Sequence, residues 1–243
     1  MVQALSAATE QIEFSKAWNL VDWIIHTYFS NDFSGAAAVN LVGALMCMVL
    51  PYLLGSINPA ILISKRMSGE DIRAWGNGDA GTDNMLRVYG KGAAIATFAC
   101  DFAKGMAAVW LGRLLWEVNG GALAGFFVLF GHMFPLFHRF KGGKGIVCLS
   151  AVVLTLSPIS FGFLALIFLV GTIGTRMVSF GSVMTALLYP LILNAFANRG
   201  LNVAMAVITA VFVTFMHREN LKLMREGKEE KLDLAALFGR TKK

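Results

Sequence analysis

Long apolar runs separated by short polar stretches fill the sequence between residues 36 and 216. A helix that crosses the hydrocarbon core of a membrane needs about 20 mostly apolar residues, because backbone in lipid must satisfy its own hydrogen bonds. We therefore predict an all-α, polytopic integral membrane protein with about seven transmembrane helices, at residues 36–55, 92–116, 122–137, 145–156, 159–173, 177–196 and 201–216. The fourth and fifth segments are short and separated only by Ser157 and Pro158, so they form either half-spans or a tight hairpin.

Composition excludes a disordered chain and disfavours a water-soluble enzyme. Of the 243 residues, 56% are hydrophobic and only 15% are charged, and the mean hydropathy is +0.64. The net charge of +6 and the pI near 9.4 would suit a nucleic-acid binder or a protein bound to an anionic membrane, and the apolar runs favour the membrane over nucleic acid. The three cysteines lie inside apolar runs without metal-ligand spacing, so no disulfide framework is expected.

The distribution of Lys and Arg predicts the orientation of the chain. With seven spans, 17 of the 21 Lys and Arg residues fall on one side of the membrane. Cytoplasmic loops carry the excess of positive charge. The amino terminus is therefore expected outside, and the carboxyl terminus and the charged loops are expected in the cytoplasm.

Three parts of the chain are expected. Residues 1–35 form an amino-terminal extension, in which residues 12–29 mix apolar and aromatic side chains with Lys16 and Asp22, a pattern typical of an amphipathic helix in the membrane interface. Residues 36–217 form the seven-span domain. Residues 218–243 form a basic cytoplasmic tail.

A glycine-rich stretch, the glycine loop (residues 76–84), lies in the longest polar segment, flanked by Arg73 and Arg87. Its Gly76, Gly78 and Gly81 match the pattern G-x-G-x-x-G, but no apolar strand precedes them, so a dinucleotide fold is excluded. Glycines at this density allow consecutive backbone N–H groups to form an anion-binding concavity. A flexible re-entrant loop, in which the glycines only permit tight turns, is the equal alternative.

A second stretch, HRFKGGKG, is the lysine loop (residues 138–145). Lys141 and Lys144 bracket Gly142 and Gly143 immediately before an apolar helix. Backbone donors, a helix amino-terminal end and a lysine together favour a phosphate dianion. The alternative is a basic anchor at the end of a span, which explains the lysines but not the paired glycines.

Other polar residues lie within or next to the predicted spans. Asp101 and Lys104 stand three residues apart on one helix face, where they either pair to fix helix packing or contact substrate. Ser182 lies on a helix stripe that starts at Arg176, and hydroxyls there either join helices or face a site. His217 and Asn220 share a face just after the last span.

These clusters together resemble the acyl-phosphate:glycerol-3-phosphate acyltransferase family, the PlsY type, over nearly all of residues 52–230. The motifs that carry the resemblance are GSINPAILISK, DIRAWGNGDAGTDNMLRVYGK, DFAKG, GHMFPLFHRFKGGKG, RMVSFGS and HRENLKLMREGKE. The resemblance implies an integral enzyme of bacterial inner membranes, with its active site facing the cytoplasm. It would move an acyl group from acyl phosphate to the 1-hydroxyl of glycerol 3-phosphate, giving lysophosphatidic acid for phospholipid biosynthesis.

The resemblance also implies roles for individual residues. The expected catalytic set is Arg87, Lys144, Ser182, His217 and Asn220. The expected substrate-binding set is Ser56, Arg73, Gly76, Gly78, Gly81, Asn84, Lys104, Lys141, Gly142 and Gly143. Neither a metal nor a cofactor is expected, and coenzyme A and acyl carrier protein are not used directly. The expected partners are the two substrates, the lipid bilayer and the enzyme that forms acyl phosphate, with no nucleic acid.

The glycine loop departs from the family pattern G-S-G-N-x-G-x-T-N at three positions, where this chain has Asn77, Asp79 and Asp83. Two carboxylates beside a dianion repel it unless they are paired or turned away. We expect Asp79 or Asp83 to pair with Arg73 or Arg87. Two alternatives to the enzyme are a transporter or channel for anionic metabolites and a catalytically silent relative, the latter suggested by these carboxylates.

Overall fold

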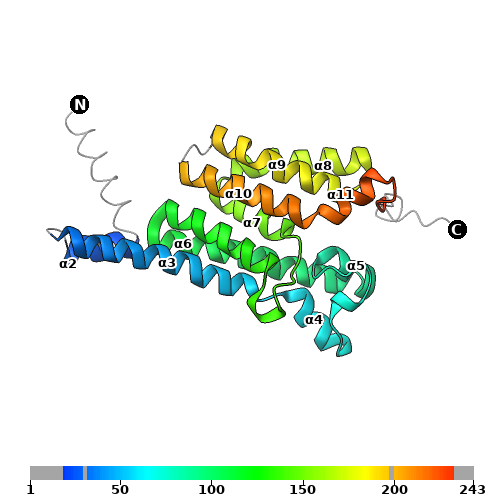
Figure 1. Ribbon diagram of the computed structural model, residues 1–243, viewed down its shortest axis with the longest axis horizontal. Helices are drawn as coiled ribbons and strands as arrows, with labels where there is room; N and C mark the ends of the chain where they lie inside the picture. Colours follow the sequence, from blue (N-terminus) through cyan, green and yellow to red (C-terminus); the bar gives the residue numbers. More distant parts are fainter. Residues whose placement is uncertain (1–18, 30–31, 197–199, 233–243) are drawn as a thin grey trace.

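The computed structural model describes residues 19–29, 32–196 and 200–232. This part of the chain is an elongated bundle of α-helices with two short 3₁₀ helices and no strand (Figure 1). The elements are α2 (Leu20–Tyr28), α3 (Phe33–Ser56), α4 (Pro59–Ser68), η1 (Ile72–Ala74), α5 (Thr82–Tyr89), α6 (Lys91–Met133), η2 (Leu136–His138), α7 (Ile146–Leu156), α8 (Pro158–Thr175), α9 (Val178–Phe196), α10 (Gly200–Met216) and α11 (Arg218–Arg225). The predicted all-α membrane fold is confirmed.

Each of the seven predicted segments corresponds to a helix or to half of one. The second and third segments are joined in α6, which is broken by non-helical backbone at Trp116 and Glu117. Glu117 has φ 48°, a left-handed conformation that reverses the chain between the two halves. The two halves of α6 are closely packed against each other, because a Cβ on Gly112 would lie 2.2 Å from the carbonyl oxygen of Gly120.

In the described part of the chain, fewer helices than seven meet the length and composition of a membrane span. By length and composition, five helices in the described residues suffice to cross a membrane, or six if the bent pair α10 and α11 is one span. With 11 residues, α7 is about 16 Å long, whereas a hydrocarbon core is about 30 Å thick. The count of seven and the orientation of the termini therefore stay predictions.

The junction of α7 and α8 is very short and lies at the predicted break between these two segments. Ser157 is the only residue between the helices. Its side chain accepts a hydrogen bond from the backbone N–H of Ser160, and Pro158 occupies the first helical turn, where it needs no donor. The capping serine and the proline together end one helix and begin the next.

Helices α3 and α6 approach each other so closely that only glycine fits at two contacts. A Cβ on Gly55 would lie 2.1 Å from the carbonyl oxygen of Val128, and one on Gly131 would lie 2.2 Å from that of Tyr52. Small residues at such contacts allow the dispersion-driven packing typical of helices in lipid. The contact holds the second half of α6 against the end of α3.

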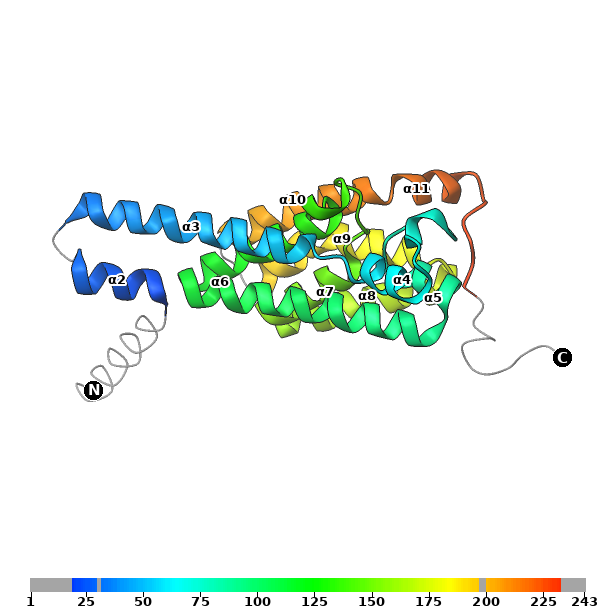
Figure 2. The same ribbon diagram turned by 90° about the horizontal axis from the view of Figure 1, so that it is seen from below.

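The polar elements gather at one end of the bundle. Figures 1 and 2 show α4, α5 and α11 at this end and α2 at the opposite end. Helix α2 packs through Val21 against Gly43 of α3 and leaves Trp23 and Tyr28 exposed. A helix was expected over residues 12–29, and α2 forms residues 20–28 of it. Its place in the membrane interface stays a prediction, and residues 12–18 lie outside the described residues.

Candidate active site

Asn84 is the centre of the glycine loop. Its side chain is fully buried, and its amide nitrogen donates to the carbonyl oxygens of Trp75 (2.9 Å), Asp79 (3.0 Å) and Ile72 (3.2 Å). Its amide oxygen accepts from the backbone N–H of Asn77 at 3.1 Å. Asn84 was predicted to bind substrate. Its polar atoms instead bond the backbone of the loop, so Asn84 supports the shape of the site from inside the protein.

The three glycines of the loop serve different purposes. Gly76 and Gly78 have φ of 61° and 78°, where a side chain is strained, and a Cβ on Gly76 would lie 2.0 Å from the amide oxygen of Asn84. Gly81 has extended backbone and precedes α5 as its N-cap residue. The glycines thus permit the tight winding around Asn84.

The lysine loop is wound back onto the end of α6. Arg139 and Phe140 are both left-handed, with φ of 58° and 57°. The backbone N–H of Gly142 donates to the carbonyl oxygen of Met133 at 3.0 Å, and that of Gly143 donates to His132 at 3.2 Å. The prediction that these two amides cradle a phosphate does not fit this structure, because both donors are already used within the protein.

Arg73 joins the two loops. It forms a two-pronged ion pair with Asp71 (2.9 and 2.7 Å) and donates to the carbonyl oxygens of His138 (2.9 Å) and Lys141 (2.7 Å). The hydrogen bonds from Arg73 hold the pKa of the Asp71 carboxyl below its ordinary value. This pair persists at neutral pH and weakens only when the pH falls through that lowered pKa. Arg73 fastens loops here, in contrast to its predicted substrate role, and does not pair with Asp79 or Asp83.

Two cations at this end carry carboxylate partners. Lys144 pairs with Asp79, a partner that the expectation for the carboxylates of Asp79 and Asp83 did not include. Arg87 pairs with Asp83 at 2.9 Å, as expected, and also with Glu230 near the end of the described chain. Asp79 and Asp83 are thus neither unpaired nor turned away, and each covers one predicted phosphate ligand.

His217 and Asn220 stand at the turn from α10 into α11. His217 is 2% exposed, and its Nδ1 lies 2.8 Å from the carbonyl oxygen of Val213. Because a carbonyl only accepts, Nδ1 carries the proton, and Nε2 of the neutral ring is an acceptor. Burial lowers the pKa of His217 below its ordinary value, which favours the neutral ring.

The segment after α11 returns over the site and holds Asn220. The amide nitrogen of Asn220 donates to Glu229 at 2.9 Å, and the backbone N–H of Leu232 donates to the carbonyl oxygen of Arg176 at 2.6 Å. Glu229 is only 9% exposed. Sequence reasoning missed Glu229 and Glu230, because a charged tail gives no signal of which residues fold back.

Of the remaining predicted residues, Ser182, Ser56 and Lys104 bond to neighbouring groups of the protein, and Lys141 is exposed. Ser182 is buried and donates to the carbonyl oxygen of Val178 one turn earlier, at 2.9 Å. Ser56 donates to Tyr52 (2.9 Å) and accepts from the backbone of Leu136 (3.1 Å), which ties α3 to η2. The side chain of Lys141 is exposed. Lys104 is buried within α6 and contacts Asp101 and His132.

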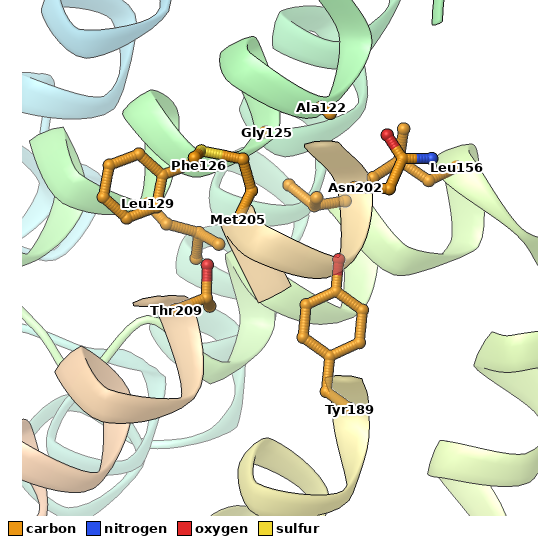
Figure 3. A pocket seen from close by; sticks show the side chains of 10 residues that line it. Ala122, Gly125, Phe126, Leu129, Leu156, Tyr189, Asn202, Met205 and Thr209 are labelled. Carbon is orange, nitrogen blue, oxygen red and sulfur yellow. The ribbon is translucent and has the colours of Figure 1, made fainter. Parts of the chain in front are cut away.

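An apolar region of the bundle contains a separate small cavity of about 10 Å³ between α6, α7, α9 and α10. Tyr189 and Asn202 reach it from different helices (Figure 3). The amide oxygen of Asn202 is buried and has no hydrogen-bond partner in the described part of the chain. A space of this size and polarity fits about one water molecule, so it is not a substrate site.

The helices and the clustered loops define a polytopic membrane protein whose polar end carries paired cations suited to anionic ligands. A family model described as glycerol-3-phosphate acyltransferase matches residues 45–227. Relatives of this name are 39% identical over 194 residues in Geobacter sulfurreducens (79% of this chain, 98% of the relative) and 36% identical over 185 residues in Syntrophomonas wolfei (76% and 95%).

Solved structures agree with the sequence comparison. The chain is similar to the crystal structure of PlsY (YgiH), an integral membrane glycerol 3-phosphate acyltransferase, in its glycerol 3-phosphate form, with a TM-score of 0.75 and 29% identity over 80% of this chain and 98% of that one. The lysophosphatidic acid form gives a TM-score of 0.70 at 29% identity, over 77% and 94%. The chain belongs to the glycerol-3-phosphate acyltransferase family, and the predicted resemblance and enzyme class are confirmed.

Replacing the centre of the glycine loop tests its structural role. Asn84→Ala removes a buried side chain that bonds four backbone groups, and each unsatisfied group costs about 1–3 kcal/mol. We expect a clearly lower melting temperature in detergent and faster proteolysis of the loop. The matched control is Asn77→Ala, an exposed residue of the same loop, which should change stability by about 0.5 kcal/mol or less. Equal melting temperatures for the two variants would contradict this role.

Proposed function

We propose that this chain transfers an acyl group from acyl phosphate to the 1-hydroxyl of glycerol 3-phosphate, giving lysophosphatidic acid and inorganic phosphate. The observation that carries the proposal is that Lys144, Arg87, His217 and Asn220 gather at one polar end of a membrane bundle. There Lys144 pairs with the glycine loop, and the segment that follows α11 contacts both Arg87 and Asn220. Both substrates carry a phosphate, and the two cations give each phosphate a counter-ion. The family name of the relatives supports the same reaction.

In the proposed site Lys144 binds one phosphate and Arg87 binds the other. Each cation now has a carboxylate partner that is partly exposed: Asp79 on Lys144, and Asp83 and Glu230 on Arg87. Such ion pairs are worth only about 0–1 kcal/mol, so a phosphate dianion can displace them. The carboxylates therefore act as counter-ions that substrate replaces, and Glu230 lies on the segment that must move with that exchange.

The reaction begins when the hydroxyl oxygen attacks the acyl carbonyl carbon. The bond from this carbon to the phosphate oxygen then breaks, and the departing phosphate takes up the proton of the alcohol. Acyl phosphate is already activated and brings its own base, so the protein contributes mainly position and charge stabilisation. His217 is the rival base, because its Nε2 is an acceptor in the neutral ring.

The acyl chain is proposed to lie along the aromatic contact between α6 and α10. The residues around this contact are Phe126, Leu129, Phe130, Met133, Thr209 and Phe212. Phe212 of α10 lies 5.4 Å from Phe130 and 5.9 Å from Phe134, measured between ring centroids. Because the lysine loop bonds the carbonyl of Met133, this aromatic wall begins beside the proposed phosphate site and runs into the membrane part.

We further infer that the protein lies in a bacterial inner membrane with this end in the cytoplasm. The support is the positive charge of the loops, because Lys and Arg concentrate on the cytoplasmic side. The enzyme that forms acyl phosphate is then a natural neighbour, because acyl phosphate is a labile donor used at the same membrane face. The direct test of the reaction is incubation of purified protein with both substrates, followed by measurement of released phosphate and lysophosphatidic acid.

Removing one counter-ion tests the exchange of carboxylate for phosphate. Asp79→Asn frees Lys144 and should lower the KM for the phosphate substrate that Lys144 binds, by about twofold to fivefold, which corresponds to a partly exposed ion pair. Lys144→Ala should abolish turnover. Glu226→Gln breaks an exposed ion pair with Lys228 outside the site and serves as the control, with unchanged kinetics. An unchanged or raised KM for Asp79→Asn would show that Asp79 orients Lys144 for catalysis.

His217→Ala distinguishes between the two candidate proton acceptors, which are the leaving phosphate and His217 itself. If the leaving phosphate takes the proton, kcat should fall by less than roughly tenfold, because loss of a general base costs about 10²-fold to 10⁴-fold. Steady-state kinetics give kcat, and calorimetric titration with glycerol 3-phosphate checks that binding remains. Lost turnover with intact binding would instead identify His217 as the base.

Phe212→Ala tests the proposed position of the acyl chain at the aromatic contact between α6 and α10. Loss of the aromatic contacts should raise the KM for acyl phosphate about tenfold, equivalent to about 1.4 kcal/mol, and leave the KM for glycerol 3-phosphate unchanged. Phe215→Ala is the matched control, since Phe215 lies on the same helix and is 53% exposed. Equal effects of the two variants on acyl phosphate would place the chain elsewhere.

A further inference from the structure

Three ionisable side chains that take no part in the proposed reaction meet inside α6. Lys104 Nζ lies 2.8 Å from Asp101 Oδ1 and 3.0 Å from His132 Nδ1, and His132 Nδ1 lies 3.2 Å from Asp101 Oδ1. All three residues are at most 7% exposed. Ionisable groups inside a membrane bundle are expensive to bury, so a cluster of three calls for a function.

Lys104 ties this cluster to the end of α3. Its ammonium donates to the carbonyl oxygens of Ile57 at 2.9 Å and Gly55 at 3.2 Å, in addition to its contacts with Asp101 and His132. Nδ1 of His132 faces both the ammonium of Lys104 and the carboxylate of Asp101, so this edge of the ring is held by the cluster. The ring of His132 is thereby fixed in one orientation.

The other edge of the His132 ring faces the two loops of the site. A Cβ on Gly143 would lie 2.5 Å from His132 Nε2 and 2.7 Å from the carbonyl oxygen of Ala80. The backbone carbonyl of His132 also accepts from the N–H of Gly143 at 3.2 Å, and Asn58 donates to the Ala80 carbonyl at 3.1 Å. Nε2 therefore sits where the lysine loop meets the glycine loop.

In each loop, the residue adjacent to this contact carries one half of an ion pair of the site. Lys144 follows Gly143, and Asp79 precedes Ala80. A shift of His132 would separate Gly143 from Ala80 and move Lys144 with it. An error of about 1 Å in the position of a binding group can cost roughly 100-fold in rate.

We propose that His132, held by Asp101 and Lys104, is a positioning residue that sets the lysine loop against the glycine loop and thereby places Lys144. The proposal rests on the binding of a substrate phosphate by Lys144, as proposed above. A purely structural triad differs from this in one respect. It needs only the Nδ1 edge of the ring, which completes the ion cluster, whereas a positioning residue also needs the Nε2 edge against Gly143.

Two substitutions of His132 test the Nδ1 and Nε2 edges of the ring separately. The amide of His132→Asn lies near the position of Nδ1 and leaves the Nε2 position empty, whereas the amide of His132→Gln reaches the Nε2 position. Positioning predicts that the Gln variant keeps more activity, with kcat/KM for glycerol 3-phosphate reduced roughly tenfold to 100-fold further in the Asn variant. An Asn variant as active as the Gln variant, or more active, overturns the proposal.

A matched control distinguishes positioning from lost stability. Thr97 is buried on α6, one turn before Asp101, and donates only to the carbonyl of Ala93 at 2.9 Å. Thr97→Val should change the melting temperature in detergent but not kcat/KM. If a His132 variant does not fold, Asp101→Asn gives the same test, and normal kinetics in that folded variant would also overturn the proposal.

The two proposals fail in distinguishable ways. A wild-type protein that releases no phosphate and forms no lysophosphatidic acid overturns the proposed reaction alone. Positioning is then measured by calorimetric titration with inorganic phosphate, which should bind wild type and His132→Gln more tightly than His132→Asn. Equal phosphate affinities in the three proteins overturn the positioning role.

Discussion

The absence of water in the hydrocarbon core is the constraint on which the rest of this structure depends. Backbone groups there must bond within helices, and charged groups must be paired or moved to the membrane surface. The described helices comply, and the polar loops collect at one end of the bundle. The proposed site for two charged phosphates and one long acyl chain lies at that boundary, between the paired cations and the aromatic contact of α6 and α10.

At this boundary the loops are held by side chains and not by regular secondary structure. Asn84 bonds four backbone groups of the glycine loop, Arg73 joins that loop to the lysine loop, and Lys104 bonds two carbonyls at the end of α3. Each of these side chains was expected to contact substrate. The geometry gives them a common role beneath the site, while Lys144 and Arg87 retain pairs that a phosphate can replace.

Sequence reasoning located the helices well, because hydropathy and the tight turns at Glu117 and Ser157 are local properties. It located the site as a region, because the charged and glycine-rich motifs cluster on one predicted side. It could not assign Arg73 or the amides of Gly142 and Gly143, since their partners are backbone carbonyls, which no side-chain pattern reveals. Glu229 and Glu230 were missed because their contacts depend on the path of the chain after α11.

The two aspartates of the glycine loop change the electrostatics of the site without changing its fold. Asp79 and Asp83 project from a loop whose winding is set by Asn84 and the glycines, so a carboxylate at either position leaves the backbone undisturbed. Each carboxylate neutralises one cation, so the empty site needs no free anion to offset Lys144 and Arg87. If Lys144 and Arg87 bind the phosphates as proposed, phosphate binding is an exchange of one anion for another, and its net gain is smaller than that of binding to an unpaired cation. A site of this kind favours substrates that carry the full dianionic charge, because a monoanion gains too little to displace a carboxylate already in place.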